Sequence, residues 1–197
     1  MIKSSILRTL SVIGLALLWN AQASAASVYV TPAATSVGLG TDVSVTIDFD
    51  GFVDYLTGGG FTIGFNSSVL QVASFTWDAD FSDPFFSFVG AIDNVAGTIT
   101  DSTFASFTSG PVGTVATIVF STVGTGVSDI LLMDTSDPVG LGQWADGFTP
   151  LFVADGSLTL TSAQVSVVPI PPAIWLLGSG LIGLFGLGRR QKAGTTA

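Results

Sequence analysis

The feature that most limits what this chain can fold into is the placement of its cations. All five basic residues lie near the two ends of the chain, at Lys3, Arg8, Arg189, Arg190 and Lys192. Between Thr9 and Gly188 there is no Lys, Arg or His, whereas all 14 acidic residues fall in that interval and each is an aspartate. Basic residues beside apolar segments stay on the cytoplasmic side of a membrane. The pattern therefore predicts that both ends begin inside the cell and that the acidic middle is exported.

The first 25 residues have the three parts of a secretory signal peptide. A basic segment, Met1–Arg8, precedes an apolar run, Leu10–Trp19, that is too short to span a bilayer comfortably. Ala23-Ser24-Ala25 then offers a small-x-small cleavage site, so we expect the mature chain to begin at Ala26. The alternative is an uncleaved membrane anchor.

The last 30 residues carry a second apolar run. Ala173–Gly188 is uncharged, and Arg189-Arg190 follows it directly. Trp175 stands where an aromatic residue at the outer membrane interface belongs. The run is slightly short for a hydrocarbon core of about 30 Å. It predicts a short transmembrane helix with residues 193–197 in the cytoplasm.

The order of these elements resembles the PEP-CTERM sorting signal, which exosortase recognises in many Gram-negative bacteria that produce exopolysaccharide. The matching stretch, residues 169–192, joins a proline box to a glycine-rich apolar helix and an arginine-rich stop. Ile170 stands where this family usually has Glu. The resemblance implies an exosortase partner and a membrane-anchored precursor. The residues implicated in sorting and processing are Val168, Pro169, Ile170, Pro171, Arg189 and Arg190. A plain membrane anchor is the alternative.

The middle of the chain, residues 26–160, predicts one all-β domain. It contains no Glu, few strong helix formers, and abundant Val, Thr and Phe. The chain has no cysteine, so a packed core must hold the domain without disulfides. The acidic surface disfavours nucleic acid and anionic lipid headgroups as partners. Residues 161–168 are interpreted as a linker to the proline box.

Alternating apolar and polar residues mark the strands of this domain. Val43, Val45, Ile47 and Phe49 alternate with polar residues, and residues 115–120 form a nearly continuous apolar run. Glycine-rich and Asn-containing turns separate such segments. About nine strands joined by short turns predict a β-sandwich of the jelly-roll kind.

The succession of segments also resembles the cohesin-like domain. The matching stretches are VSVTIDF at 43–49, GGFTIGFNSSVLQV at 59–72, GTVATIVF at 113–120 and DGSLTL at 155–160. Cohesins of cellulosomes bind dockerin modules through one sheet face. The resemblance therefore implies a non-catalytic binding module, although the sequence does not identify the recognition surface.

Two aspartate clusters suggest cation binding. Asp48, Asp50 and Asp54 surround a glycine turn, where alternate carboxylates can wrap a hard cation such as Ca²⁺. A similar cluster spans residues 78–83. The alternative for both clusters is a solvated turn with no cofactor.

Aromatic residues suggest a second kind of ligand. Trp144 and Phe148 lie in a loop-like stretch and are expected to be exposed, where they would stack on sugar rings. A further aromatic group between residues 75 and 88, beside the second aspartate cluster, would form a carbohydrate-binding face if exposed, but it is expected to belong mainly to the core.

The sequence argues against catalysis. The exported part has no His, Cys or Lys, which excludes a Ser-His-Asp triad, a cysteine nucleophile and a His-ligated zinc. We therefore predict an exported, exosortase-processed protein of the cell surface or extracellular matrix, as in a biofilm, acting as a non-catalytic adhesion module. The alternatives are a carbohydrate-binding domain and, with less support, a polysaccharide hydrolase using two aspartates.

Overall fold

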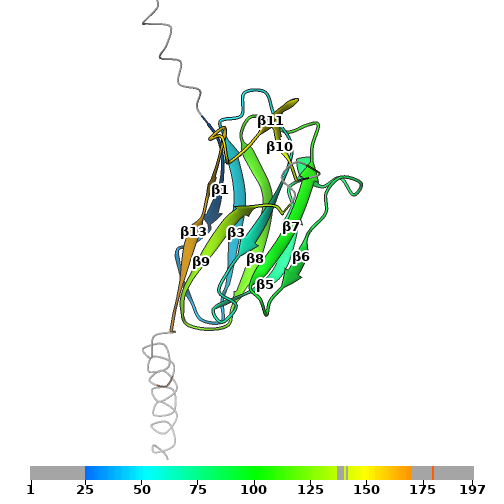
Figure 1. The fold of residues 1–197 in the computed structure, drawn as a ribbon. Coiled ribbons are helices and arrows are strands. Elements are labelled where there is room, and N and C mark those ends of the chain that lie inside the picture. Colours follow the sequence, from blue (N-terminus) through cyan, green and yellow to red (C-terminus); the bar gives the residue numbers. More distant parts are fainter. Residues whose placement is uncertain (1–24, 137–139, 141, 170–178, 180–197) are drawn as a thin grey trace, which may run out of the picture.

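The computed structural model describes residues 25–136, 140, 142–169 and 179. In this part of the chain two β-sheets pack face to face (Figure 1). Nine strands of four or more residues form the body: β1 (Ala26–Pro32), β3 (Asp42–Asp50), β4 (Leu56–Gly64), β5 (Leu70–Trp77), β7 (Thr98–Ala105), β8 (Gly113–Thr122), β9 (Gly126–Asp134), β12 (Leu158–Thr161) and β13 (Ala163–Val168). Shorter elements complete it: β2 (Ser36–Gly38), β6 (Ala91–Asp93), β10 (Trp144–Asp146), β11 (Thr149–Leu151) and the 3₁₀ helix η2 (Ala79–Phe81). The predicted all-β sandwich is confirmed.

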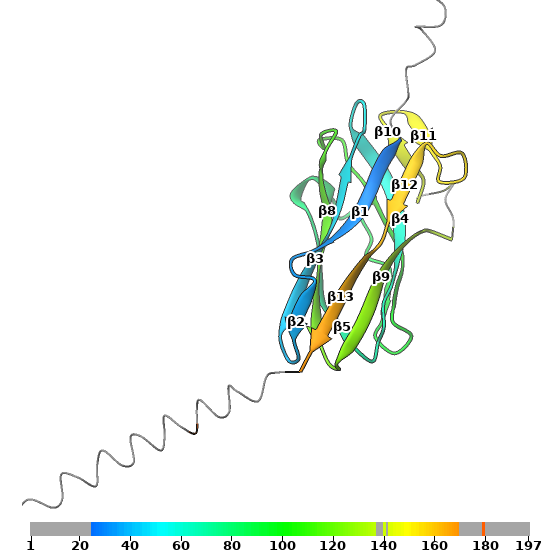
Figure 2. The same cartoon turned by 90° about the vertical axis from the view of Figure 1, so that its left-hand side faces the viewer.

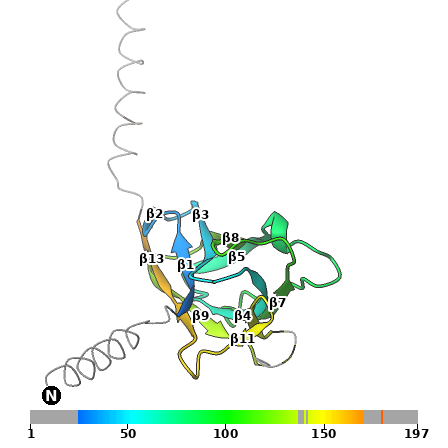
Figure 3. The same cartoon turned by 90° about the horizontal axis from the view of Figure 1, so that it is seen from above.

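The two sheets differ in size and complexity. The five-stranded sheet has the order β12-β1-β3-β8-β5. The eight-stranded sheet has the order β11-β10-β4-β9-β13-β2, with β7 paired to β4 and β6 paired to β7. Seen from above, β3, β8 and β5 lie on one side of the interior, and β9, β4 and β7 lie on the other (Figure 3).

One edge of the sandwich is closed by segments that change sheets. β1 pairs with β3 and β12 in the five-stranded sheet, and the chain then crosses to β2, which pairs with β13 in the other sheet. Only Ser162 separates β12 from β13, so the end of the chain crosses at the same edge (Figure 2). Strands that switch sheets in this way make the corners of such sandwiches.

The prediction of a linker at 161–168 is wrong for most of its length. Ala163–Val168 forms β13, which pairs antiparallel with β9 and parallel with β2. Val165 and Val167 are buried, whereas Gln164 is exposed. This alternation is a strand pattern, and the burial of its two valines ties the segment to the core. The sandwich therefore continues to Val168.

The core follows from the strand patterns. Val43, Val45, Ile47 and Phe49 are all buried, while the residues between them face outward. Phe81 of η2 adds a further buried ring, which makes edge contacts with Phe49 at 5.7 Å and with Phe104 at 5.1 Å between ring centroids. Burying one such phenylalanine contributes about 1.5–3 kcal/mol. These rings fix η2 and the loops beside it to the sandwich.

Candidate functional site

The outer face of the five-stranded sheet is polar and satisfied by its own hydrogen bonds. Asp48 accepts hydrogen bonds from the hydroxyls of Thr46 at 2.8 Å and Thr114 at 2.7 Å. At the other end of β3, Asp42 accepts one from Ser121 at 2.7 Å. The bonds from Thr114 and Ser121 join β8 to β3, whereas the bond from Thr46 lies within β3. We refer to this surface, the outward residues of β1, β3, β8 and β5, as the polar face.

The predicted calcium ligands are not gathered into a cage. Across the residues that the structure describes, no group of three His, Cys, Asp or Glu side chains is placed to hold a metal ion. Asp48 is engaged with two threonines, and Asp50 lies two residues further along the same strand. Asp54 lies outside β3, in the loop before β4, beside Gly147. The geometry therefore gives the calcium hypothesis no support.

The polar face carries unbalanced negative charge. Tyr29 lies opposite Asp48 in the pairing of β1 with β3. Partial burial of its ring raises the pKa of Tyr29, and the carboxylates of Asp50 and Asp48 raise it further. Because residues 9–188 contain no cation, no side chain in that interval offsets this effect.

The outer face of the eight-stranded sheet is different, because strand β9 exposes apolar side chains. Val127, Leu131 and Met133 point outward and are 49%, 46% and 41% exposed. Within the described residues, no strand of the five-stranded sheet contributes an exposed large apolar side chain. Leu131 and Met133 are neighbours on this side of the strand, whereas the exposed Asp129 separates them from Val127. Exposed apolar surface of this kind can mark an interaction site.

Neighbouring strands extend this apolar row into a shallow surface. Leu131 lies opposite Gly64 of β4, which in turn lies opposite Thr98 of β7. Met133 lies opposite Thr62. A depression of about 470 Å³ lies over this part of the sheet. It is lined by Gly64, Phe65, Asn66, Gly97, Thr98, Val127, Asp129, Leu131 and Met133. We call this surface the β9 face. Its apolar centre and polar margin match the anatomy of a protein interface.

A strained residue borders the β9 face. Asp101 of β7 has a φ of 55°, the left-handed conformation, and among the described residues it is the only one other than glycine with a positive φ. It coincides with a register shift between β4 and β7. Its carboxylate accepts hydrogen bonds from the N–H and hydroxyl of Ser136 at 2.8 and 3.0 Å. Such bulges are common beside functional sites, and the conformation costs about 1–2 kcal/mol.

The predicted exposed pair Trp144 and Phe148 is half wrong. Phe148 is 96% exposed, as expected, but Trp144 is only 1% exposed. Trp144 begins β10, and its ring lies 5.4 Å from that of Phe104. A Cβ atom at Gly59 would lie 2.5 Å from the Trp144 ring, so the glycine makes room for the tryptophan. Trp144 is therefore a core residue, and the pair forms no ligand platform.

The aromatic group between residues 75 and 88 is divided between core and surface. Phe81 is buried, and Phe75 and Trp77 pack partly buried against the core. The remaining three rings, Phe85, Phe86 and Phe88, are exposed. The expectation that this group belongs mainly to the core therefore holds for only half of its members.

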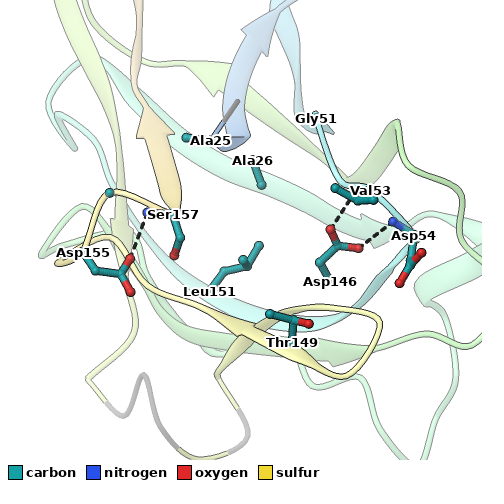
Figure 4. A pocket seen from close by; sticks show the side chains of 11 residues that line it. Ala25, Ala26, Gly51, Val53, Asp54, Asp146, Thr149, Leu151, Asp155 and Ser157 are labelled. Atoms are coloured by element: carbon teal, nitrogen blue, oxygen red, sulfur yellow. Dashed lines mark hydrogen bonds between the residues drawn. The ribbon is translucent and has the colours of Figure 1, made fainter. Parts of the chain in front are cut away.

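A residue that sequence reasoning missed lies beside a depression of about 660 Å³ (Figure 4). Asp146 of β10 accepts hydrogen bonds from the backbone N–H groups of Val53, Asp54 and Tyr55 at 2.6, 2.9 and 3.2 Å. It thereby fixes the loop between β3 and β4. Because both of its oxygens are engaged and it is 9% exposed, Asp146 has a structural role. No spacing in the sequence signals this contact, which joins residues more than 90 positions apart.

The residues implicated in sorting lie largely outside the described part of the chain. Val168 ends β13, and its carbonyl accepts a hydrogen bond from the N–H of Leu39 at 2.9 Å. Val168 and Pro169 are exposed. Ile170, Pro171, Arg189 and Arg190 are not described, nor are residues 1–24 of the predicted signal peptide and the apolar run 173–188 apart from Ser179. Among the residues that are described, no helix has the length and apolar character needed to cross a membrane.

Comparison with known proteins places the fold among cohesins. No family model and no curated protein matches the sequence. The chain is similar to the second type II cohesin of the adaptor ScaA scaffoldin of Acetivibrio cellulolyticus, with a TM-score of 0.58 and 12% identity over 76% of this chain and 94% of that one. It is similar to the cohesin OlpA of Clostridium thermocellum in complex with a dockerin, with a TM-score of 0.57 and 16% identity over 74% of this chain and 100% of that one.

A cohesin from outside the cellulosome has the same architecture. The non-cellulosomal cohesin of the hyperthermophilic archaeon Archaeoglobus fulgidus matches with a TM-score of 0.54 and 11% identity, over 74% of this chain and 92% of that one. At these identities the likeness establishes the fold alone. The chain therefore has a cohesin-like β-sandwich, as its segment order suggested.

Proposed function

We propose that this protein is an exported, exosortase-processed component of the cell surface or extracellular matrix, and that its acidic sandwich binds a protein partner through the β9 face. The observation that carries the proposal is the exposed apolar row of Val127, Leu131 and Met133 on a domain whose opposite sheet is polar outside. The solved cohesin–dockerin complex is an example of this fold in a protein-binding role.

The proposed role is non-catalytic. Between residues 9 and 188 the sequence has no His, Cys or Lys, so the usual nucleophile–base pairs cannot be formed there. The aspartates of the polar face are bonded to hydroxyls, as Asp48 and Asp42 illustrate. These contacts give the carboxylates a role in holding strands together.

The proposed export route fits the position of the sorting signal. β13 ends at Val168, immediately before Pro169 and the rest of the proline box. A proline cannot donate to a sheet ladder, so the box marks the end of the folded domain. Exosortase would cut here after the apolar run had held the precursor in the inner membrane.

Mass spectrometry of the exported protein tests the processing. The expected mature chain begins at Ala26 and ends between Val168 and Pro171. An exported form that keeps residues 1–25 or 173–192 would contradict the proposed route. That result would leave the binding proposal standing, because the β9 face lies within residues 64–133.

The binding proposal is tested by capturing partners from the cell envelope on immobilised protein. A Leu131→Asp, Met133→Asp variant should lose the partner that the wild type retains, because charges would replace the centre of the contact. Ser44→Asp, an exposed position on the polar face, is the matched control and should retain it. Circular dichroism should show that the wild type, the double variant and the control variant are all folded. Retention of the same partner by the double variant would refute the role of the β9 face.

A further inference from the structure

A second exposed apolar feature lies where the loop after β5 meets the loop after β7. Phe86 of the first loop is 50% exposed and Phe107 of the second is 76% exposed. Their ring centroids are 6.3 Å apart, with the ring planes at 83°. The two rings thus form an angled apolar surface. Its lining shares no residue with the depression on the β9 face.

The loops that carry these rings are fixed by the core and by hydrogen bonds. Phe81, only 1% exposed, anchors η2 at the start of the first loop. Asp83 accepts a hydrogen bond from the N–H of Phe85 at 2.8 Å. Phe88 bridges to Thr103 of β7 through a pair of backbone hydrogen bonds. The aromatic surface is therefore presented by an ordered frame, which reduces the entropic cost of binding.

Polar groups surround a small hollow between the two loops. The hollow measures about 370 Å³, which is at the lower end of the range for small-molecule sites, about 300–1,000 Å³. Asp80 and Asp83 line it together with the hydroxyl-bearing residues Ser82, Ser106 and Thr108. The Thr108 hydroxyl donates to Asp80 at 3.2 Å and links the loops. Rings and hydrogen-bonding groups thus converge on one site.

The charges of the hollow restrict the ligand. A carboxylate only accepts hydrogen bonds, so Asp80 and Asp83 select hydroxyl or N–H donors. No cation is available anywhere between residues 9 and 188 to pair with an acidic ligand. Phosphates and uronic acids are therefore repelled. A neutral sugar ring has the matching chemistry, since its C–H face packs on an aromatic ring and its hydroxyls donate to carboxylates.

We infer that the hollow between the two loops binds a neutral hexose unit of an extracellular polysaccharide, with Phe86 and Phe107 as the stacking surface and Asp80 and Asp83 as hydroxyl acceptors. This site goes beyond the proposed protein-binding function. It would give the module a second contact in the matrix, on a surface separate from the β9 face.

Affinity gel electrophoresis of the exported protein tests the inference. The gels contain cellulose-derived glucan, dextran, galactomannan or, as the acidic comparison, polygalacturonate. We expect at least one neutral polysaccharide to retard the protein and polygalacturonate to have no effect. Phe86→Ala and Phe107→Ala should each weaken the retardation about tenfold, since each removes an aromatic contact.

Phe148→Ala is the matched control, because it removes a phenylalanine that is 96% exposed and does not line the hollow. It should leave retardation unchanged. Thermal melts should show that the two loop variants are folded, as expected for exposed side chains. The inference is overturned if no neutral polysaccharide retards the protein, if both loop variants bind as well as the wild type, or if these variants lose a captured protein instead of a glycan. None of these results bears on the β9 face, whose own test uses Leu131 and Met133.

Discussion

The two outer faces of the sandwich have the same strand alternation but differ in the polarity of their outward side chains. On the polar face, outward positions carry mainly Asp, Ser and Thr, and hydroxyl–carboxylate bonds such as that from Thr114 to Asp48 join one strand to the next. On the β9 face, three outward positions carry the exposed apolar residues Val127, Leu131 and Met133, and one carries Asp129. Both sheets contribute buried apolar side chains to one core. The difference between the outer sides is therefore not a requirement of the fold, and it is the basis for proposing the β9 face as the partner surface.

In the cation-free interval of residues 9–188, hydrogen bonds take the place of ion pairs. Oppositely charged side chains cannot pair within residues 9–188, and several aspartates are instead held by hydroxyls or backbone N–H groups, as are Asp48 and Asp146. Asp146, with three backbone donors, is the most extensively bonded example. Hydrogen bonds to a charged group contribute more than those between neutral groups.

The largest effect should come from filling the depression on the β9 face. Gly64 faces outward between Leu131 and Thr98, and a Cβ atom there would meet only ordinary contacts, the nearest at 3.4 Å from Met133. Gly64→Trp should leave the fold intact and reduce partner affinity by about a hundredfold, because the new ring occupies the contact surface. Ser44→Trp on the polar face is the control. Binding competition against wild-type protein measures the change in affinity. Equal losses of affinity in Gly64→Trp and Ser44→Trp would contradict a difference between the two faces.

Removing a carboxylate from the polar face should affect stability and not binding. Asp48→Ala deletes the acceptor of two threonine hydroxyls and should lower the free energy of unfolding by about 1–2 kcal/mol. Asp48→Asn keeps one acceptor oxygen and should lose less. Urea denaturation measures both changes. A loss of partner binding in these variants, without unfolding, would show that the polar face takes part in recognition.

The bulge beside the β9 face gives a smaller and more specific prediction. Asp101→Ala loses the bonds to Ser136 and keeps the left-handed backbone, whereas Asp101→Gly loses the same bonds but relieves the strain. The glycine variant should therefore be more stable than the alanine variant by about 1 kcal/mol. Thermal or urea unfolding of the two variants tests this order. The reverse order would mean that residue 101 is not held in the left-handed conformation.

The smallest effect concerns the charge of the polar face. Burial and the neighbouring carboxylates raise the pKa of Tyr29 above its unfolded value of about 10, so folding favours the neutral phenol. This contribution to stability is complete below the unfolded pKa and is lost as pH rises through the folded pKa. Asp50→Asn should lower the pKa of Tyr29, and Asp129→Asn on the β9 face should not. Phenolate absorbance in a Tyr55→Phe background isolates the titration of Tyr29, and an unchanged pKa in Asp50→Asn would contradict the assigned cause.

Local patterns predicted the sheets better than the site. Val43 to Phe49 alternate strictly, and side-chain direction in a strand follows from that period alone. Trp144 was misjudged because its burial depends on Gly59, a residue far away in the sequence whose missing side chain makes room for the ring. The bonds of Asp146 likewise depend on long-range packing.

The sequence of β9 contains a signal of the exposed apolar surface. Residues 130–133, Ile-Leu-Leu-Met, are apolar on both sides of the strand, although one of these sides faces outward. Such a run predicts either burial on both sides or an exposed apolar surface. Only the placement of β9 between β4 and β13, with no further layer of described residues outside it, decides between these alternatives.

Photocrosslinking from single introduced cysteines tests the central claim most directly. The chain has no cysteine, so Met133→Cys and Ser44→Cys each give one attachment point for a benzophenone label, on the β9 face and the polar face respectively. In cell-envelope extracts we predict a discrete protein adduct from position 133 and none from position 44. An adduct from position 44 alone, or no adduct from position 133 under conditions where the captured partner is present, would contradict the assignment of the β9 face as the binding surface.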